Sequence, residues 1–247
     1  MSNPTACLII IGNEILSGRT KDKNLPWLAE QLNMIGVTLA HARVIRDEVA
    51  EIVDTVNECR ATYDYVFTTG GIGPTHDDIT TECVAKAFGV PVIRSEEAET
   101  RLRKHYDPKD INEARLKMAN TPEGAALIDN PVSSAPGYRM ENVYVFAGVP
   151  AIMQAMFDSM KHELKGGAPT LSRALNVLMA EGDLAMGVDD IQAQFPEVEV
   201  GSYPMIHAGK LATSLVMRSQ NEAMLDSAFS TCQEFVASMG GEEVEKM

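Results

Sequence analysis

The run from Tyr65 to Thr80 reads YVFTTGGIGPTHDDIT, and this stretch decides the fold. Its apolar start predicts a buried strand over residues 65–68, and the glycines that follow predict a tight turn. A helix is predicted from about Thr80 to Phe88, because Gly89 and Pro91 would end it there. A strand that leads through a glycine turn into a helix is typical of a parallel α/β sheet.

The flanking sequence repeats this alternation of strands and helices. Cys7–Ile11 is a continuous apolar run, which is the pattern of a strand buried on both faces. We also predict helices with Asn24 and Asp47 as N-caps, a strand over 37–45, a largely helical segment over 95–119, a strand over 143–146 and a helix over 151–164. This order predicts a three-layer α/β/α domain with a mostly parallel sheet.

The stretch Lys165-Gly166-Gly167-Ala168-Pro169 has the composition of a linker. Beyond it the pattern changes, with predicted strands over 171–177 and 211–217 and a helix over 221–239. We therefore predict two domains, residues 1–167 and residues 168–247, of which the second is a small α+β unit.

The charge balance restricts the partners. Lys and Arg number 21 against 35 Asp and Glu, which gives a formal net charge of −14. Nucleic acids and anionic membrane surfaces require a basic footprint, so neither is expected as a partner. The longest apolar run, Ala6–Ile11, is too short to cross a bilayer, and the N-terminus shows no secretory pattern, so a cytoplasmic location is expected. The four cysteines lie in apolar stretches without C-x-x-C spacing, which predicts buried, reduced thiols.

The glycine turn points to an anionic ligand. Such turns direct several N–H groups into one concavity, and open parallel sheets bind ligands at the carboxyl ends of their strands. A carboxylate about 5 Å from a phosphate oxygen costs roughly 3 kcal/mol at an effective dielectric of 20. Asp77 and Asp78 beside a bound phosphate therefore indicate an intervening divalent cation such as Mg²⁺. The alternative is a plain connection in which Thr75, Asp77 and Asp78 only cap the helix.

The segment Thr69–Thr80 resembles the signature of the MoaB/Mog-type molybdopterin-binding domain, in the Gly-Pro-Thr-x-Asp-Asp-x-Thr form of the competence/damage-inducible protein A (CinA) family. Similar matches are Gly12–Gly18 with Asp22 and Asn24, Val44–Asp47, Asn130 with Ala135–Tyr138, and Gly148–Pro150. The resemblance covers about Thr5–Leu164, and the remainder resembles a small KH-like domain.

This resemblance implies a set of site residues. Asp78 and Asp47 correspond to the catalytic carboxylates, and together with Glu14 they would hold the metal. Ligand contacts are implied for Thr69, Gly70, Gly71, Gly73, Pro74, Thr75, Gly12, Asn13, Glu14, Ala135, Pro136, Gly137 and Lys117. From the residues alone, Asp47 is equally well explained as a helix cap, and Lys117 as a solvated lysine.

The resemblance further implies a metal-dependent nucleotide pyrophosphatase that acts on ADP-ribose or FAD and assembles as a homo-oligomer. Two alternatives stay open: a molybdopterin adenylyltransferase-like enzyme, and a non-catalytic module that binds a pterin or a nucleotide. All three readings require a phosphorylated small molecule, and molybdopterin is one such ligand.

Three departures from the family pattern occur. Ser133-Ser134 replaces Gly-Thr before Ala135, Ala147 replaces a proline, and Ile152 replaces a glutamate. If that glutamate contributes to metal or substrate binding, Ile152 weakens or removes catalysis. The sequence also lacks the NMN deamidase domain of longer members, so that activity is not expected.

Overall fold

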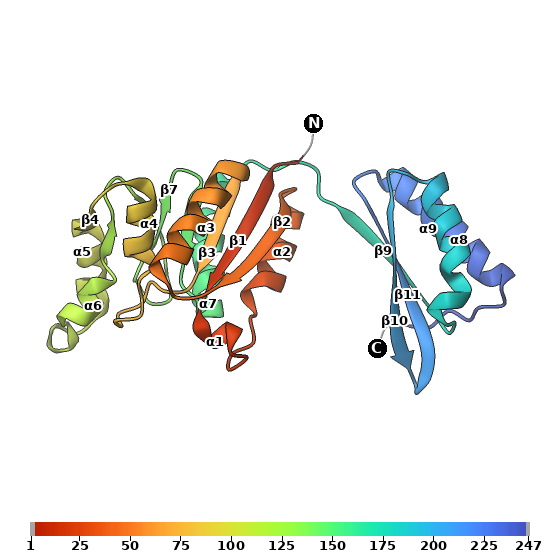
Figure 1. Ribbon diagram of the computed structural model, residues 1–247, viewed down its shortest axis with the longest axis horizontal. Coiled ribbons are helices and arrows are strands. Elements are labelled where there is room, and N and C mark those ends of the chain that lie inside the picture. The colour runs from red at the N-terminus through yellow and green to blue at the C-terminus, as the bar shows by residue number, and fades with distance from the viewer. Residues whose placement is uncertain (1–2, 246–247) are drawn as a thin grey trace. The chain divides into compact units, whose positions relative to one another are not determined.

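The computed structural model describes residues 3–245, and the chain forms two compact units, 1–167 and 168–247. The first unit contains a six-stranded sheet in the order β2-β1-β3-β8-β7-β6 (Figure 1). Its strands are β1 (Thr5–Ile11), β2 (Thr38–Ile45), β3 (Tyr65–Thr69), β6 (Ala126–Ile128), β7 (Gly137–Met140) and β8 (Val143–Phe146). β1 pairs in parallel with β2 and β3, and β3 pairs in parallel with β8, whereas β7 and β6 are antiparallel. The mostly parallel sheet predicted from the sequence is confirmed.

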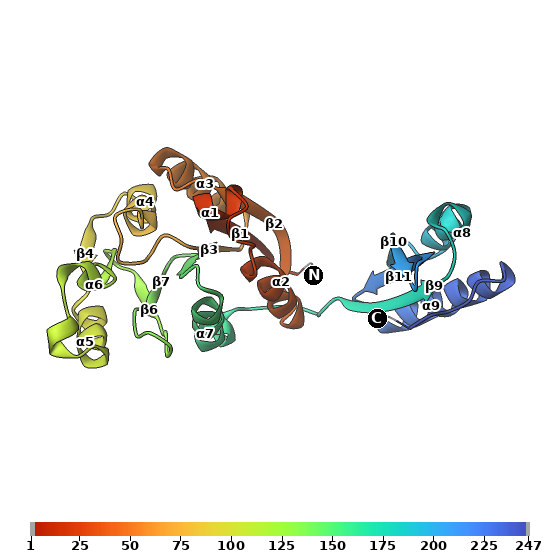
Figure 2. The ribbon, with the colours of Figure 1, turned by 90° about the horizontal axis from the view of Figure 1, so that it is seen from below.

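Helices cover both faces of this sheet, as the three-layer prediction requires (Figure 2). The helices of the unit are α1 (Asn13–Leu16), α2 (Asn24–Met34), α3 (Val49–Thr62), α4 (Thr80–Phe88), α5 (Glu96–His105), α6 (Glu113–Lys117) and α7 (Pro150–Met160), with 3₁₀ turns at Pro108–Asp110 and Lys161–Glu163. α2 and α7 pack on one face and α3 and α4 on the other. β1 is apolar throughout because Leu8 and Ile10 face the first pair of helices while Cys7 and Ile9 face the second.

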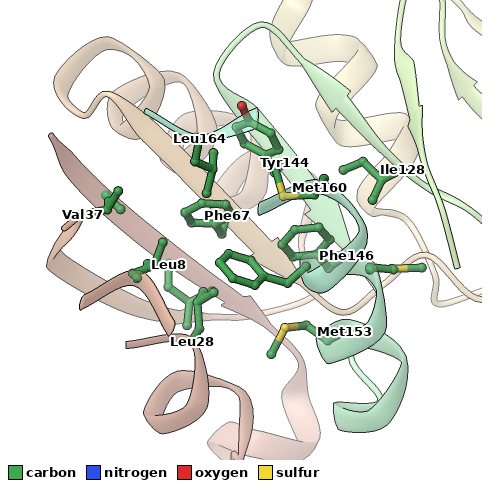
Figure 3. Close-up of a cluster of buried hydrophobic side chains, with 14 of the residues drawn as sticks. Leu8, Leu28, Val37, Phe67, Ile128, Tyr144, Phe146, Met153, Met160 and Leu164 are labelled. Atoms are coloured by element: carbon green, nitrogen blue, oxygen red, sulfur yellow. The ribbon is translucent and has the colours of Figure 1, made fainter. Parts of the chain in front are cut away.

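The core between the sheet and helices α2 and α7 is built around Phe67 of β3 (Figure 3). Its ring stacks on Phe146 of β8 at 5.9 Å between centroids and meets Phe157 of α7 edge-on at 6.0 Å. All three rings are fully buried. This aromatic cluster holds together the two strands whose carboxyl ends carry the glycine turn and the loop that begins at Ala147.

Both predicted helix caps are wrong, and the difference has a common physical cause. The first N–H groups of α2 are capped by Asp22, whose carboxylate accepts from Asn24 N at 3.3 Å and Leu25 N at 2.9 Å. α3 begins at Val49 without a side-chain cap. Asn24 and Asp47 hydrogen-bond instead to other loops at the carboxyl edge of the sheet, which sequence-local reasoning could not foresee.

The segment predicted as largely helical over 95–119 contains α5 and α6, and it is flanked by two strands that were not predicted. These are β4 (Val92–Arg94) and β5 (Asn120–Pro122), which form a separate antiparallel pair. The pair joins the two ends of the segment that contains α5 and α6, and it lies beside α4 (Figure 1).

The second unit is an α+β domain, as predicted. Its elements are β9 (Leu171–Val177), α8 (Glu181–Gln194), β10 (Glu199–His207), β11 (Lys210–Ser219) and α9 (Glu222–Ser238). The strands form an antiparallel sheet in the order β10-β11-β9, and both helices pack on one face (Figure 1). α8 and β10 were not predicted, and the KH-like resemblance stays a prediction.

The cysteine prediction is confirmed, since all four thiols are free and buried. The sulfur atoms of Cys7 and Cys59 lie 3.5 Å apart. Across residues 3–245, none of the helices has the length and apolar character needed to span a membrane.

The aromatic core gives a first prediction. Phe67→Ala is expected to destabilise the first unit by about 3–5 kcal/mol, because it leaves a cavity among fully buried rings. Trp27, the single tryptophan, packs edge-on against Phe157, so its fluorescence in a urea titration reports this unit. Ile93→Ala, at a side chain 40% exposed, is the control and should change the unfolding free energy little. A loss below about 1 kcal/mol for Phe67→Ala would show that the aromatic cluster is not the centre of the core.

Candidate functional site

The turn after β3 is shaped by two glycines, of which Gly70 lies against main chain and Gly71 against the side chain of Thr80. Gly70 and Gly71 have positive φ angles of 103° and 70°. A Cβ atom on Gly70 would lie 2.2 Å from the carbonyl oxygen of Ile11, and one on Gly71 would lie 2.1 Å from Thr80 Oγ1. Larger residues therefore cannot occupy these positions without displacing the end of β1 or the start of α4.

The main-chain N–H groups of this turn are available to a ligand. Within residues 3–245, the N–H groups of Gly71, Ile72 and Gly73 donate no hydrogen bond. The turn is closed instead through neighbouring groups, because Gly70 N donates to Phe146 O at 3.2 Å and Thr80 N donates to Gly71 O at 3.0 Å. Free amides at the start of a helix, beside the carboxyl ends of parallel strands, form a favourable place for an anion.

Asp78 folds back onto the turn. Its Oδ2 accepts from the N–H of Thr75 at 2.8 Å and from the Thr75 hydroxyl at 2.5 Å. The Thr75 hydroxyl also lies beside Asp77 and holds the pKa of that carboxyl below its usual range. Thr75 thus contacts both acids, and neither acid caps α4, which begins without a side-chain cap.

A cavity of about 570 Å³ opens at this edge of the sheet. Nine of the predicted site residues line it: Asp78, Asp47, Glu14, Gly70, Gly71, Gly73, Pro74, Ala135 and Pro136. The structure therefore brings together loops that follow β1, β2 and β3 with the loop before β7. A volume of this size is ordinary for a small-molecule site.

The remaining predicted residues do not line the cavity. Thr69 is buried, and its hydroxyl has no partner within the described residues. Gly12 N donates to Ile45 O at 3.2 Å, and Asn13 N donates to Asp47 Oδ2 at 2.8 Å. Gly137 lies inside β7 against the backbone of Val145. Thr75 and Lys117 contact the turn itself.

Two asparagines that the sequence did not assign to the site hold its loops. Asn130 is buried, and its Nδ2 donates to Ala135 O at 2.8 Å and to Ser133 Oγ at 2.6 Å. Asn24 is also buried, and its Nδ2 donates to Gly148 O at 2.9 Å. Both asparagines belong to the stretches that carry the family resemblance. That resemblance was the only sequence signal that could have assigned them to the site.

The charged and apolar walls of the cavity differ sharply. Its acids are Glu14, Asp47, Asp77 and Asp78, and no Lys or Arg occurs among the described residues that line it. The apolar wall consists of Ile11, Ile72, Met118, Val149, Ile152 and Met156. Amide groups, carboxylates and an apolar wall together suit a ligand that combines an anionic group with a flat or apolar ring.

Metal ligation by protein atoms alone is not supported within residues 3–245, where no group of three or more His, Cys, Asp or Glu side chains is arranged to hold a metal ion. The donor set is nevertheless compatible with Mg²⁺, which commonly uses one or two carboxylates, water and phosphate oxygens. In the described chain, the hydrogen bonds that Asp47 and Asp78 accept all end on Oδ2. The Oδ1 atom of each carboxylate therefore remains available to coordinate a metal ion.

Family comparisons account for both units. Residues 7–166 match the family described as "Probable molybdopterin binding domain", and residues 169–242 match "FAD synthase, middle domain". A protein of Pyrobaculum calidifontis is 36% identical over 212 residues, which cover 81% of each chain. The "Probable FAD synthase" of Caenorhabditis elegans is 30% identical over 259 aligned positions, which cover 94% of this chain but 50% of that protein. The chain thus spans about half the length of this FAD synthase.

A solved structure agrees with the sequence resemblance. The protein CinA of Thermoplasma acidophilum matches with a TM-score of 0.61 and 34% identity, over 65% of this chain and 97% of that one. The match confirms the CinA-type, MoaB/Mog-like fold of the first unit. The chain therefore belongs to the probable molybdopterin binding domain family.

Proposed function

We propose that this protein is a metal-dependent pyrophosphatase that cleaves a dinucleotide such as FAD or ADP-ribose. The observation that carries the proposal is the single cavity that combines free amides of the glycine turn, carboxylates from three loops and an apolar wall. A pyrophosphate flanked by a ring system presents the complementary groups. Similarity of the second unit to the FAD synthase middle domain, and of nearly the whole chain to an FAD synthase, supports FAD among the candidate substrates.

In this proposal each part of the cavity has a distinct task. The amides of Gly71, Ile72 and Gly73 bind phosphate oxygens, and their fixed orientation stabilises charge that develops in the transition state. Asp78, Asp47 and Glu14 are the residues that would hold the metal. When bound, Mg²⁺ would neutralise phosphate charge and lower the pKa of a coordinated water. The apolar wall around Ile72 and Ile152 would pack against a ring of the substrate and exclude water.

The local charge supports a metal requirement. A diphosphate that enters a cavity lined by four acids and by no described Lys or Arg side chain meets only repulsion from the side chains. Three amide dipoles offset part of this repulsion. A divalent cation between the acids and the phosphates offsets the rest.

A second candidate is a non-catalytic module that binds a pterin or a nucleotide. It is favoured by Ile152, which places an apolar side chain in the cavity where the family resemblance implies a glutamate. The family description, with its reference to molybdopterin, also keeps an adenylyltransferase-like activity as an alternative. ATP-dependent nucleotide transfer to molybdopterin would identify that alternative.

The first functional prediction concerns Asp78. Asp78→Asn should reduce Mg²⁺-dependent release of AMP from FAD or ADP-ribose by about 10²-fold or more, because it removes a carboxylate that would hold the metal. The amide keeps the shape of the side chain, so the fold should persist, as Trp27 fluorescence can check. Asp54→Asn, on the exposed side of α3, is the matched control and should retain full activity. Equal turnover in Asp78→Asn and the wild type would rule out the proposed mechanism.

The second functional prediction concerns the metal. EDTA should abolish AMP release, and added Mg²⁺ or Mn²⁺ should restore it, whereas EDTA presaturated with Mg²⁺ should have no effect. ADP-ribose should also raise the melting temperature of the protein mainly when Mg²⁺ is present, because the two bind together. Turnover that survives EDTA would refute metal dependence. Stabilisation without any turnover would favour the non-catalytic module.

The third functional prediction tests the departure at position 152. Ile152 is half-buried at the first turn of α7 and lines the cavity. Ile152→Glu should lower the Mg²⁺ concentration that gives half-maximal activity by about tenfold, because it adds a carboxylate to an incomplete metal site. Ile152→Gln introduces a side chain of the same shape as glutamate without its charge, and it should not change this Mg²⁺ concentration. If both variants behave alike, the side chain at 152 does not contribute to metal binding.

A further inference from the structure

Lys117 ends the short helix α6, and its ammonium group binds main-chain atoms of the glycine turn. Its Nζ lies 2.7 Å from the carbonyl oxygen of Thr75 and 2.7 Å from the carbonyl oxygen of Asp78. The two acceptors are three residues apart in the turn and about 40 residues from the lysine in sequence. The side chain is half-buried, and no ion pair involving it occurs in the described chain. A lysine that donates to two carbonyl groups without a carboxylate partner departs from the usual solvated surface lysine.

Lys117 lies beside a small cavity that adjoins the cavity proposed for the ligand. It does not line the large cavity. It lines a small cavity of about 10 Å³, whose walls include Ile72, Gly73, Asp78, Met118 and Pro136, residues that also line the large cavity. This space is at most large enough for a single water molecule, so it admits no phosphate. The small cavity therefore adjoins the large one, and Lys117 meets the turn in a space that a phosphate cannot enter.

The two carbonyl contacts fix the orientation of two peptide groups. In a trans peptide the C=O and the following N–H point in opposite directions, because the group is planar. With the carbonyls of Thr75 and Asp78 directed at Lys117, the N–H groups of His76 and Ile79 point away from it. The same loop is closed on its other side by the bonds from Thr75 to the Asp78 carboxylate. Lys117 thus holds the backbone that carries Asp78.

We propose that Lys117 is a positioning residue, which orders residues 74–79 and places the Asp78 carboxylate without contacting the ligand. The effect on turnover rests on the proposed function, whereas the effect on the turn does not. The family resemblance instead implied that Lys117 contacts the ligand. The two roles differ in the ligand-free protein, because only a positioning residue orders the turn before anything binds.

Hydrogen–deuterium exchange of the ligand-free protein tests this proposal. In Lys117→Met, a variant of similar length without the charge, the amides of Thr75 and Thr80, which donate the hydrogen bonds that close this segment, should exchange about tenfold faster than in the wild type. The reason is that losing a hydrogen bond from a charged group loosens the segment by at least that factor. Lys117→Arg should keep most of the protection, since a guanidinium can donate to both carbonyls. Lys104→Met, on the exposed side of α5, is the control and should leave this segment unchanged.

Activity and ligand affinity provide the second readout. Lys117→Met should lower kcat for Mg²⁺-dependent AMP release, and Lys117→Arg should restore it. Unchanged exchange in Lys117→Met, combined with weaker binding of ADP-ribose, would overturn the proposal in favour of a direct ligand contact. If Lys117→Met loses the folded fluorescence signal of Trp27, the test rests on Lys117→Arg. Loss of protection at the amides of Thr75 and Thr80 in Lys117→Arg would also overturn the proposal. If the wild type shows no turnover, the proposed pyrophosphatase activity is refuted. The exchange experiment alone then tests the role of Lys117.

Discussion

The close approach of main chains at the carboxyl edge of the sheet is the constraint on which the rest of the site depends. Gly70 presses against the carbonyl of Ile11, and a Cβ on Gly148 would lie 3.2 Å from the Cα of Gly70. The ends of β1, β3 and β8 therefore meet backbone to backbone, with no side chain between them. This contact brings loops from distant parts of the sequence around one cavity, and it leaves the amides of the turn uncovered. The stacked rings of Phe67 and Phe146 hold β3 and β8 together next to this contact between main chains.

Polar side chains then fix each loop, and they do so at the expense of ordinary helix capping. Asn24 binds the carbonyl of Gly148, and Asp47 binds the N–H of Asn13. Asn130 organises the segment that leads to Pro136, and Lys117 holds the glycine turn. Buried polar groups of this kind are costly unless satisfied, so a loop that loses its partner leaves an unpaired atom at the cavity wall. The shape of the cavity is therefore set by long-range hydrogen bonds as well as by packing.

The difference between local patterns and long-range contacts explains which elements and contacts could be predicted from the sequence. β1 and α4 were predictable because unbroken apolar runs, helical spacing and a terminal glycine act locally. The short strands β6 and β7 were missed because they contain few residues and pair in an antiparallel hairpin at the sheet edge. α8 was hidden by Gly187, whose missing Cβ makes room for the ring of Phe235 in α9. The glycine turn and its acids were visible as a motif, whereas the contacts of Lys117 and Asn24 join residues too far apart for any local pattern to indicate.

The composition of the cavity has a consequence for the order in which its occupants bind, if the proposed function holds. The carboxylates do not complete a metal site by themselves, and with Ile152 in the wall they gain no further oxygen donor from α7. Phosphate oxygens would supply the missing ligands of Mg²⁺, while the cation would remove the repulsion between the phosphates and the acids. Each occupant would then bind weakly alone and tightly with the other, since each one creates part of the other's site. The acidic character of the chain would in this way act as a filter, which admits a diphosphate together with its cation and disfavours the free anion.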